Sequence, residues 1–292
     1  MDFIQKKPKI DKHVSFYKMH GAGNDFILID GRRSLPFDQE RFALFACHRN
    51  FGIGSDGLII LETSDIADYK MVFYDPDGTR TTCGNGLRCL GRYIVELGLL
   101  NTENRKITVE TDHNKVTLDV IGKGEKVRVD MGPAIFEGKA IPTSEHGEHI
   151  DREFEILDMK FQISAVSMGN PHAVIFVPNL DSQLVNKYGP IIEHHEFFPK
   201  RTNVNFVEIV DDENFKTMVW ERGVGRTLSC GTGICASFAI ANRKGLVGRV
   251  AKVAAEGGEF EIQLRDSRIV LTGPTEIVFE GRLDYQKLLQ NI

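Results

Sequence analysis

The feature of this 292-residue sequence that most constrains its fold is a pattern that occurs twice. In each half, a strand-like segment ends in a polar turn with an asparagine, which is Asn24 in the first half and Asn170 in the second. A cysteine followed by Gly-x-Gly comes 59 residues after the first asparagine, at Cys83, and 60 residues after the second, at Cys230. Both halves continue through further strands to a Gly-Pro pair. This shared order at near-equal spacing indicates a duplicated domain.

Each cysteine turn leads into an apolar run of helical length, 87–97 in the first half and 234–241 in the second. A glycine-rich turn before a helix leaves backbone N–H groups free to bind an anion. A cysteine at that position feels the positive end of the helix dipole, which favours its thiolate. We therefore expect Cys83 and Cys230 to be a pair of reactive thiols with lowered pKa values.

The alternation of strand and helix signals predicts a mixed α/β (α+β) fold with two domains. We expect an N-terminal domain over residues 1–130 and a C-terminal domain over residues 131–272. The last predicted strand, 276–280, begins no third unit, so we expect 273–292 to return to the first domain. Residues 1–13 are polar and lysine-rich and read as a disordered extension without the apolar region of a secretory signal.

Composition narrows the class of protein. The chain is 41% hydrophobic and 26% charged, which is typical of a soluble globular protein. Its formal net charge of −5 argues against nucleic acid or a membrane surface as a partner, and no apolar run reaches the length of a membrane span.

The five cysteines argue against a disulfide framework and for a reducing, cytoplasmic environment, because the count is odd in a long chain. Their spacings lack the Cys-x2-Cys knuckle of a zinc site, so we expect no metal. We interpret Cys47, Cys89 and Cys235 as small core residues.

Two duplicated domains that face each other would present Cys83 and Cys230 from opposite sides of a cleft. Two helix N-termini aimed at one point bind a carboxylate, and a thiolate and a thiol on either side of its α-carbon can remove and return a proton. The backbones of Gly84, Asn85, Gly231 and Thr232 can supply the N–H donors that stabilise the developing charge. The arrangement predicts a racemase that needs no cofactor. Two alternatives remain open at this point, namely inert buried cysteines and a redox pair.

Four segments carry a resemblance to a known family. They are Phe-Tyr-Lys-Met-His-Gly-Ala-Gly-Asn-Asp-Phe (16–26), Cys-Gly-Asn-Gly-Leu-Arg-Cys (83–89), Met-Gly-Asn-Pro-His (168–172), and Glu-Arg-Gly-Val-Gly (221–225) with Ser-Cys-Gly-Thr-Gly (229–233). Together they resemble diaminopimelate epimerase over nearly the whole chain. The resemblance implies interconversion of LL- and meso-2,6-diaminoheptanedioate without pyridoxal phosphate (PLP) or metal, in lysine and peptidoglycan-precursor synthesis. It also implies a homodimer, with two pseudo-symmetric domains that are each a β-barrel-like sheet around a central helix.

Carried over by position, the resemblance makes Cys83 and Cys230 the two acid/base residues. The residues it implies for substrate binding are Asn24, Asp75, Gly84, Asn85, Asn170, Asn203, Glu221, Arg222, Gly231 and Thr232, with His172 and Gly57 in supporting positions. Chemistry supports two of these roles, since Arg222 can hold a distal carboxylate in a bidentate pair and Glu221 can accept from a distal ammonium.

The sequence departs from the family pattern at two positions. Asp75 stands where the family usually has asparagine, and Arg226 follows Gly225 where many members have glutamate. We hypothesise that these two departures compensate each other. They bear on fine substrate specificity and not on the type of reaction. Two alternatives to the epimerase also stay open, namely a sister racemase that acts on another amino acid and a protein of this fold that binds without catalysis.

Overall fold

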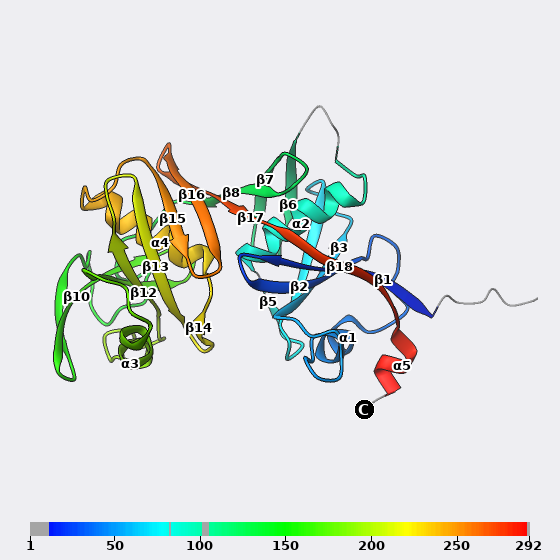
Figure 1. The fold of residues 1–292 in the computed structure, drawn as a ribbon, viewed down its shortest axis with the longest axis horizontal. Helices are drawn as coiled ribbons and strands as arrows, with labels where there is room; N and C mark the ends of the chain where they lie inside the picture. The colour runs from blue at the N-terminus through cyan, green and yellow to red at the C-terminus, as the bar shows by residue number, and fades with distance from the viewer. Residues whose placement is uncertain (1–11, 82, 101–104, 291–292) are drawn as a thin grey trace, which may run out of the picture.

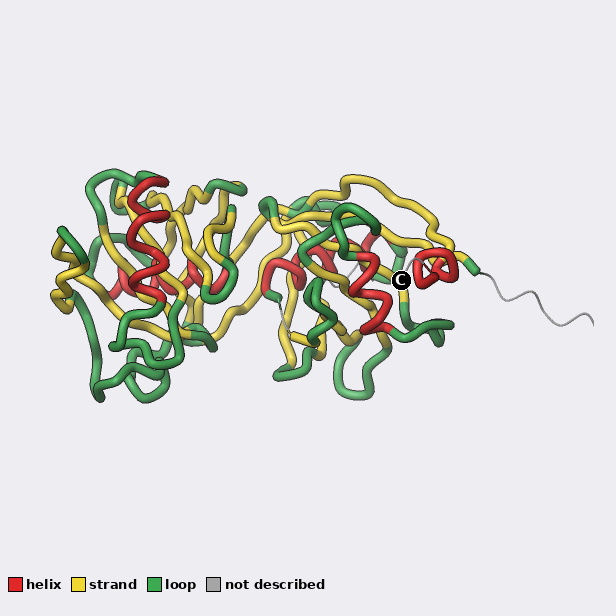
Figure 2. The backbone as a smooth tube through the Cα atoms, turned by 90° about the horizontal axis from the view of Figure 1, so that it is seen from below, coloured by secondary structure: helices red, strands yellow, loops and turns green. Residues whose placement is uncertain are grey.

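The computed structural model describes residues 12–81, 83–100 and 105–290. The chain forms two lobes side by side along the long axis of the molecule, one built from each half of the sequence (Figures 1 and 2). The expected disordered extension, residues 1–13, lies outside the described residues as far as residue 11. At its last residue the expectation of disorder is wrong, because His13 begins the first strand.

The N-terminal half carries strands on both sides of a central helix, α2. Its elements in chain order are β1 (His13–Gly21), β2 (Asn24–Asp30), α1 (Gln39–Ala46), β3 (Gly57–Glu62), β4 (Tyr69–Tyr74), β5 (Arg80–Thr81), α2 (Gly84–Glu96), β6 (Lys106–Glu110), β7 (Lys115–Ile121) and β8 (Lys126–Gly132).

The C-terminal half repeats that order around α4. Its elements are β9 (Arg152–Ile156), β10 (Met159–Ser167), β11 (Pro171–Phe176), α3 (Ser182–Glu193), β12 (Asn203–Ile209), β13 (Asn214–Glu221), β14 (Gly225–Thr227), α4 (Gly231–Arg243), β15 (Val250–Ala255), β16 (Gly258–Arg265) and β17 (Arg268–Pro274), before β18 (Glu276–Asp284) and α5 (Tyr285–Gln290).

Strand pairing shows that the two halves share one topology. In the first half β2 pairs with β3 and β4 with β6 in parallel, and the corresponding pairs β11–β12 and β13–β15 are parallel as well. The hairpins β6–β7 and β15–β16 are both antiparallel. The central helices α2 and α4 each have 13 residues. The predicted α/β fold with two pseudo-symmetric units is therefore confirmed.

Each half has an inner and an outer hydrophobic core. The inner cores lie between the sheet and the central helix and include Leu90 on α2 and Phe238 on α4. The outer cores lie beneath α1, with Phe42, and beneath α3, with Tyr188. Asp38 caps α1 as predicted, since its side chain accepts from the backbone N–H of Arg41 at 2.8 Å.

Two strands join the halves. β8 pairs antiparallel with β17 from residue 126 to residue 132, while β17 also pairs with β16 of the C-terminal half. After β17 the chain returns, and β18 pairs antiparallel with β1 over nearly its whole length. The domain limits expected at 130/131 and 272/273 stay predictions, and they fall inside β8 and β17, the two strands that connect the lobes.

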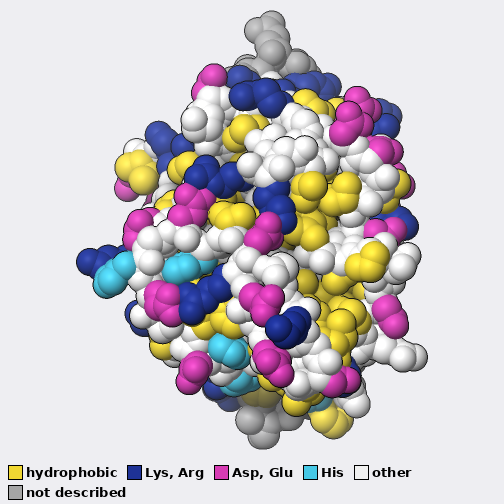
Figure 3. Space-filling view, turned by 90° about the vertical axis from the view of Figure 1, so that its left-hand side faces the viewer, with side chains coloured by type: hydrophobic (Ala, Val, Ile, Leu, Met, Phe, Trp, Pro, Cys, Tyr) yellow, Lys and Arg dark blue, Asp and Glu magenta, His cyan; other side chains and the backbone are white. Residues whose placement is uncertain are grey.

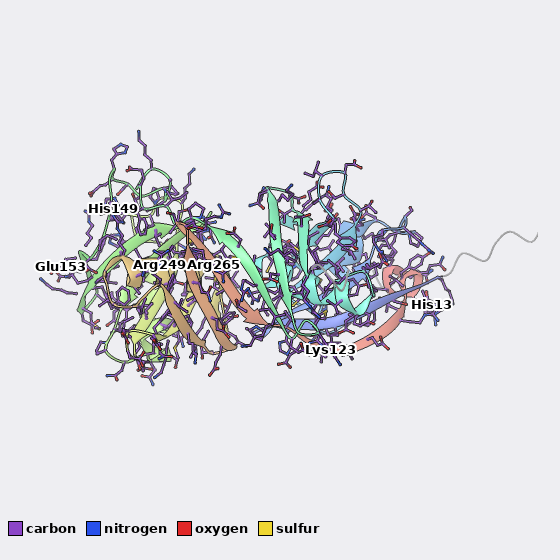
Figure 4. The ribbon with its side chains drawn as sticks, turned by 90° about the horizontal axis from the view of Figure 1, so that it is seen from above. His13, Lys123, His149, Glu153, Arg249 and Arg265 are labelled. Carbon is purple, nitrogen blue, oxygen red and sulfur yellow. The ribbon has the colours of Figure 1, made fainter. Side chains whose placement is uncertain are left out.

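At the outer end of the C-terminal half, acidic and basic side chains are interspersed over the surface (Figure 3). His149 and Glu153 lie toward that end and His13 toward the opposite end, so all three are remote from the junction of the lobes (Figure 4). In the described part of the chain, no helix combines the length and the apolar character that crossing a bilayer requires.

Candidate active site

A cavity of about 640 Å³ opens where the two halves meet, and both predicted acid/base cysteines line it. Ten of the predicted site residues contribute to its wall. They are Asn24, Cys83, Gly84, Asn85, Asn170, Glu221, Arg222, Cys230, Gly231 and Thr232. The first four come from the N-terminal half and the other six from the C-terminal half, so the fold brings both cysteine turns to one site.

Both cysteines stand at the position expected for them, immediately before the first residue of a helix. Cys83 is the N-cap of α2 and Cys230 is the N-cap of α4, each with extended backbone. Five cysteines are free thiols, so the structure holds no disulfide between them. Within the described chain, no three His, Cys, Asp or Glu side chains are arranged to hold a metal ion.

The surroundings of Cys83 are polar and come from the first half. Its thiol donates to Oδ1 of Asn24 at 3.6 Å, and the same oxygen accepts from Nδ2 of Asn85 at 3.2 Å. Nδ2 of Asn24 donates to Oδ2 of Asp56 at 2.8 Å, and Arg49 holds the other oxygen of that carboxylate at 2.6 Å. Because Asp56 accepts only, it fixes which end of the Asn24 amide faces the thiol.

A partly buried ion cluster supports that arrangement. Asp25 follows Asn24 in the chain and accepts from Arg49 at 2.8 Å and from Lys18. Burial alone would raise the pKa of Asp25, but the hydrogen bonds from Arg49 and Lys18 lower it to about 2. The polar Gly-Asn-Asp turn is thus an ordered part of the wall.

Cys230 has a different set of neighbours. Its Sγ lies 3.4 Å from Oγ1 of Thr232, which accepts from Nδ2 of Asn170 at 3.4 Å. The charge of the Glu221 carboxylate also acts on the Cys230 thiol. The hydroxyl of Thr227 donates to the same carboxylate, and this hydrogen bond fixes the position of the Glu221 side chain.

Burial reverses the direction we expected for the two thiols. Burial raises the pKa of Cys83 to about 11, although the backbone N–H groups of Gly86 and Asn85 act in the opposite sense. Burial and then the charge of Glu221 raise the pKa of Cys230 well above its ordinary value. The expectation of lowered pKa values is therefore wrong, because removal from water outweighs the effect of the helix termini.

His172 lies behind the wall and holds Asn170. It is fully buried, its Nε2 lies 3.0 Å from Oδ1 of Asn170, and its Nδ1 lies 3.1 Å from Nδ2 of Asn205. An amide oxygen accepts and an amide nitrogen donates, so the ring proton is on Nε2. Burial and then the charge of Arg222 lower the pKa of His172 to about 3, which keeps the ring neutral.

Three other predicted residues also stand outside the described lining of the cavity. The side-chain oxygen of Asn203 accepts from the backbone N–H of Arg222 at 3.0 Å and so holds the backbone of Arg222 in place. Gly57 begins β3, and a Cβ there would lie 2.5 Å from the ring of Phe73. The Asp75 carboxylate accepts a hydrogen bond from the Thr81 hydroxyl at 2.9 Å. Thr81 lines the cavity, whereas Asp75 does not.

Arg226 forms an ion pair with Glu256, in the turn between β15 and β16, and its Nε donates to that carboxylate at 3.2 Å. Asp75 has Thr81 as its partner instead. The two departures from the family pattern are thus bound to different neighbours, and the structure gives no support to the hypothesis that they compensate each other directly.

Sequence reasoning missed one side of the cavity. The additional lining residues are Thr81, Leu87, Thr111, His113, Asn114, Val116, Val129, Asp130, Met131, Met168 and Gly169. Met168 and Gly169 belong to a segment that the resemblance had already marked. The residues between 111 and 131 belong to the β6–β7 turn and to β7 and β8, and their sequence carries no signal that distinguishes them from ordinary surface strands.

A family model, diaminopimelate epimerase, matches residues 16–137 and 164–278, which together form most of the chain and include both cysteine turns. The chain belongs to the diaminopimelate epimerase family. It is 42% identical over 278 residues to the diaminopimelate epimerase of Methanococcus maripaludis, a match that spans 93% of this chain and 100% of that protein. It is 40% identical over 282 residues to the diaminopimelate epimerase of Acetivibrio thermocellus, across 94% of this chain and 100% of that protein.

Solved structures extend the likeness in fold beyond the family. A hydroxyproline epimerase from Agrobacterium vitis superposes with a TM-score of 0.69 at 15% identity, covering 95% of this chain and 92% of the other. A phenazine biosynthesis protein of the PhzF family from Bacillus anthracis gives 0.67 at 16% identity, covering 93% and 99%. At such low identity these proteins share the two-lobed fold, whereas membership of the diaminopimelate epimerase family makes this chain an isomerase.

Proposed function

We propose that this protein interconverts LL- and meso-2,6-diaminoheptanedioate, without PLP or metal, by a two-base reaction between Cys83 and Cys230. The observation that carries the proposal is that two N-cap cysteines, one from each half, line a single cavity. The α-carboxylate binds between the two helix N-termini, at the backbone N–H groups of Gly84–Asn85 and Gly231–Thr232. The α-carbon then has one sulfur on each face.

The reaction requires one thiolate, and Glu221 can generate it. Its carboxylate acts electrostatically on the Cys230 thiol and lines the same cavity, and burial raises the pKa of Glu221 toward that of a useful base. With the Cys230 proton on Glu221, the thiolate removes the α-proton while the Cys83 thiol gives its proton to the opposite face. Solvent returns the proton from Glu221 to Cys83 after product leaves. The opposite stereochemical direction uses the same groups with the cysteine roles exchanged.

The distal end of the substrate would lie toward Asn170 and Arg222. Arg222 lines the cavity, and Asn203 fixes its backbone. Nη1 of Arg222 donates to the backbone oxygen of Lys200 at 3.3 Å, and the remaining guanidinium donors can hold a carboxylate. Asp75 reaches the cavity through Thr81, so its effect on specificity would be indirect. His172 would act on the substrate only by orienting Asn170.

Four further features complete the proposal. We assign the protein to the cytoplasm, as a homodimer in lysine and peptidoglycan-precursor synthesis, with domains over 1–130 plus 273–292 and over 131–272. The five free cysteines support a reducing compartment. Light scattering during size-exclusion chromatography tests the dimer, since a mass near the 32.8 kDa of one chain would contradict it.

The decisive experiment follows deuterium uptake at the α-carbon of LL-diaminopimelate in deuterated water, with the protein kept reduced. Wild-type protein should incorporate deuterium and form the meso isomer, while Cys83→Ala and Cys230→Ala should form no meso product. Cys47→Ala is the matched control, because that thiol lies in the outer core beneath α1. Absence of exchange in the wild type, or epimerisation in either active-site variant, would contradict the proposal.

A further inference from the structure

The side chain of Arg88 is a buried cation for which the site described above has no role. It projects from α2 and is 0% exposed. Nη2 donates to Oδ1 of Asn85 at 2.8 Å, and among the described residues Nε and Nη1 have no hydrogen-bond partner. A buried guanidinium with unsatisfied donors is costly, so a stable fold that retains one indicates a compensating use.

Arg88 lies at the junction of the two halves. Its guanidinium stands over the ring of Phe260, on β16 of the C-terminal half, at 5.2 Å from the ring centroid. A Cβ on Gly273 of β17 would lie 2.7 Å from Nε, and a Cβ on Gly231 would lie 3.7 Å from Nη1. Gly231 is the first residue of α4, so a side chain from α2 reaches the first turn of the opposite helix.

The bond to Asn85 determines what the Asn85 amide can do. Because its oxygen accepts from Arg88, its Nδ2 must face the other way, where it donates to Oδ1 of Asn24 at 3.2 Å and to the backbone oxygen of Ser229 at 3.4 Å. Asn24 is the acceptor for the Cys83 thiol, and Ser229 directly precedes Cys230. A single amide, oriented by Arg88, therefore contacts the surroundings of both cysteines.

The charge of Arg88 has no counterpart in the other half. Counting from each cysteine, the residue at the same helix position in α4 is Cys235. The charged groups that act on Cys83 are Arg88, from α2, and Glu221, from β13, and they act in opposite directions. Glu221 is also the charged group that faces Cys230. The positive charge is thus placed where a thiolate and a bound carboxylate bring negative charge.

We propose that Arg88 is a positioning residue shared by the two cysteine turns, which orients Asn85 for both and provides the buried positive charge that stabilises the Cys83 thiolate and the bound carboxylate. The inference rests on the proposed function for its substrate. Its effect on the thiols does not depend on which substrate the site takes.

The test compares Arg88→Met, which removes the charge and the hydrogen bond to Asn85, with Arg88→Lys, which keeps the charge on a shorter side chain. Arg92→Met is the matched control. Arg92 lies one turn further along α2, with Nε 3.3 Å from Glu96 and Nη1 3.4 Å from the backbone oxygen of Thr275, outside the described lining of the cavity. Three quantities are measured for each variant, namely alkylation of Cys83 and Cys230 by iodoacetamide against pH, kcat and KM for α-proton exchange, and Tm.

In Arg88→Met, alkylation of Cys83 near neutral pH should slow about tenfold, which corresponds to a rise of about one unit in its pKa. The kcat for exchange should fall about a hundredfold, as expected when reacting groups are displaced by about 1 Å. Arg88→Lys should restore alkylation to within about threefold of wild type, less than half a pKa unit, but recover only part of kcat. Arg92→Met should match wild type in alkylation and kcat.

Lower Tm in Arg88→Met with unchanged alkylation and kcat would make the role merely structural and overturn the inference. If Arg88→Met does not fold, Arg88→Lys decides, and wild-type kcat in that variant would overturn the positioning role. If the wild type fails to exchange diaminopimelate, the proposed function fails, while the alkylation profiles still decide whether Arg88 stabilises the thiolate.

Discussion

Gly257→Ala places one methyl group at the contact between the two halves. A Cβ built on Gly257 lies 1.9 Å from the backbone oxygen of Ala22, in the turn between β1 and β2. The same oxygen accepts from Oγ of Ser229 at 2.9 Å, and the backbone N–H of Gly257 donates to the oxygen of Leu228 at 2.9 Å. The substitution therefore acts on the contact that locates the Cys230 turn against the Asn24 turn.

The size of the effect follows from that geometry. Real Cβ atoms essentially never come within 3.0 Å of such an atom, so the contact must widen by at least 1.1 Å (3.0 − 1.9). The atom that must move is backbone, which cannot rotate away, so we expect a loss of about 1–3 kcal/mol in the free energy of unfolding. A displacement of about 1 Å between reacting groups can cost about a hundredfold in rate, so kcat for exchange should fall by that factor.

The assay measures α-proton exchange and thermal unfolding for Gly257→Ala beside Gly248→Ala. A Cβ on Gly248 would find its nearest atoms at 3.9 and 4.0 Å, so the control should keep wild-type turnover and gain up to about 1 kcal/mol of stability. The expected fall in Tm for Gly257→Ala is about 2–4 °C for each kcal/mol lost. Wild-type kcat in Gly257→Ala, or an equal loss in Gly248→Ala, would refute the reasoning.

Three further outcomes concern ionisable groups of the site. The rate of Cys83 alkylation by iodoacetamide should rise about tenfold per pH unit from about pH 7 to 10, because only the thiolate reacts and the pKa of Cys83 is about 11. A plateau of that rate in the middle of the range would contradict this prediction. Glu221→Gln should slow exchange about 10²- to 10⁴-fold by removing the base, yet speed alkylation of Cys230 because the negative charge that raises its pKa is gone; slower alkylation would contradict this account. Burial raises the pKa of the Asp75 carboxyl, so the folded protein keeps this proton to higher pH than the unfolded chain and loses stability as pH rises through that range. Urea unfolding should therefore show that Asp75→Asn is more stable than wild type at neutral pH and equally stable below about pH 3.9. A stability difference that grows in acid would exclude this cause.

Local sequence was sufficient to predict the parts of the fold that depend on neighbouring residues. The cysteine turns lead directly into α2 and α4, because Gly-x-Gly followed by an apolar run signals a helix start within a few residues. α3 had no such signal, since Gly189 and Pro190 inside it argue against a helix and only packing onto the outer core of the second half compensates. β5 and β14, with two and three residues, are too short to show alternation.

The sequence by itself determined the duplication and the two cysteines, because the repeat is written in spacings along the chain. Only the tertiary structure decided the state of those cysteines, since the pKa of a thiol depends on burial by residues that are distant in sequence. The same holds for Arg88, whose neighbours Phe260 and Gly273 lie more than a hundred positions away, and for the wall between residues 111 and 131. A repeat predicts which residues correspond, but the contact between the repeats is made once, by residues that the pattern does not share.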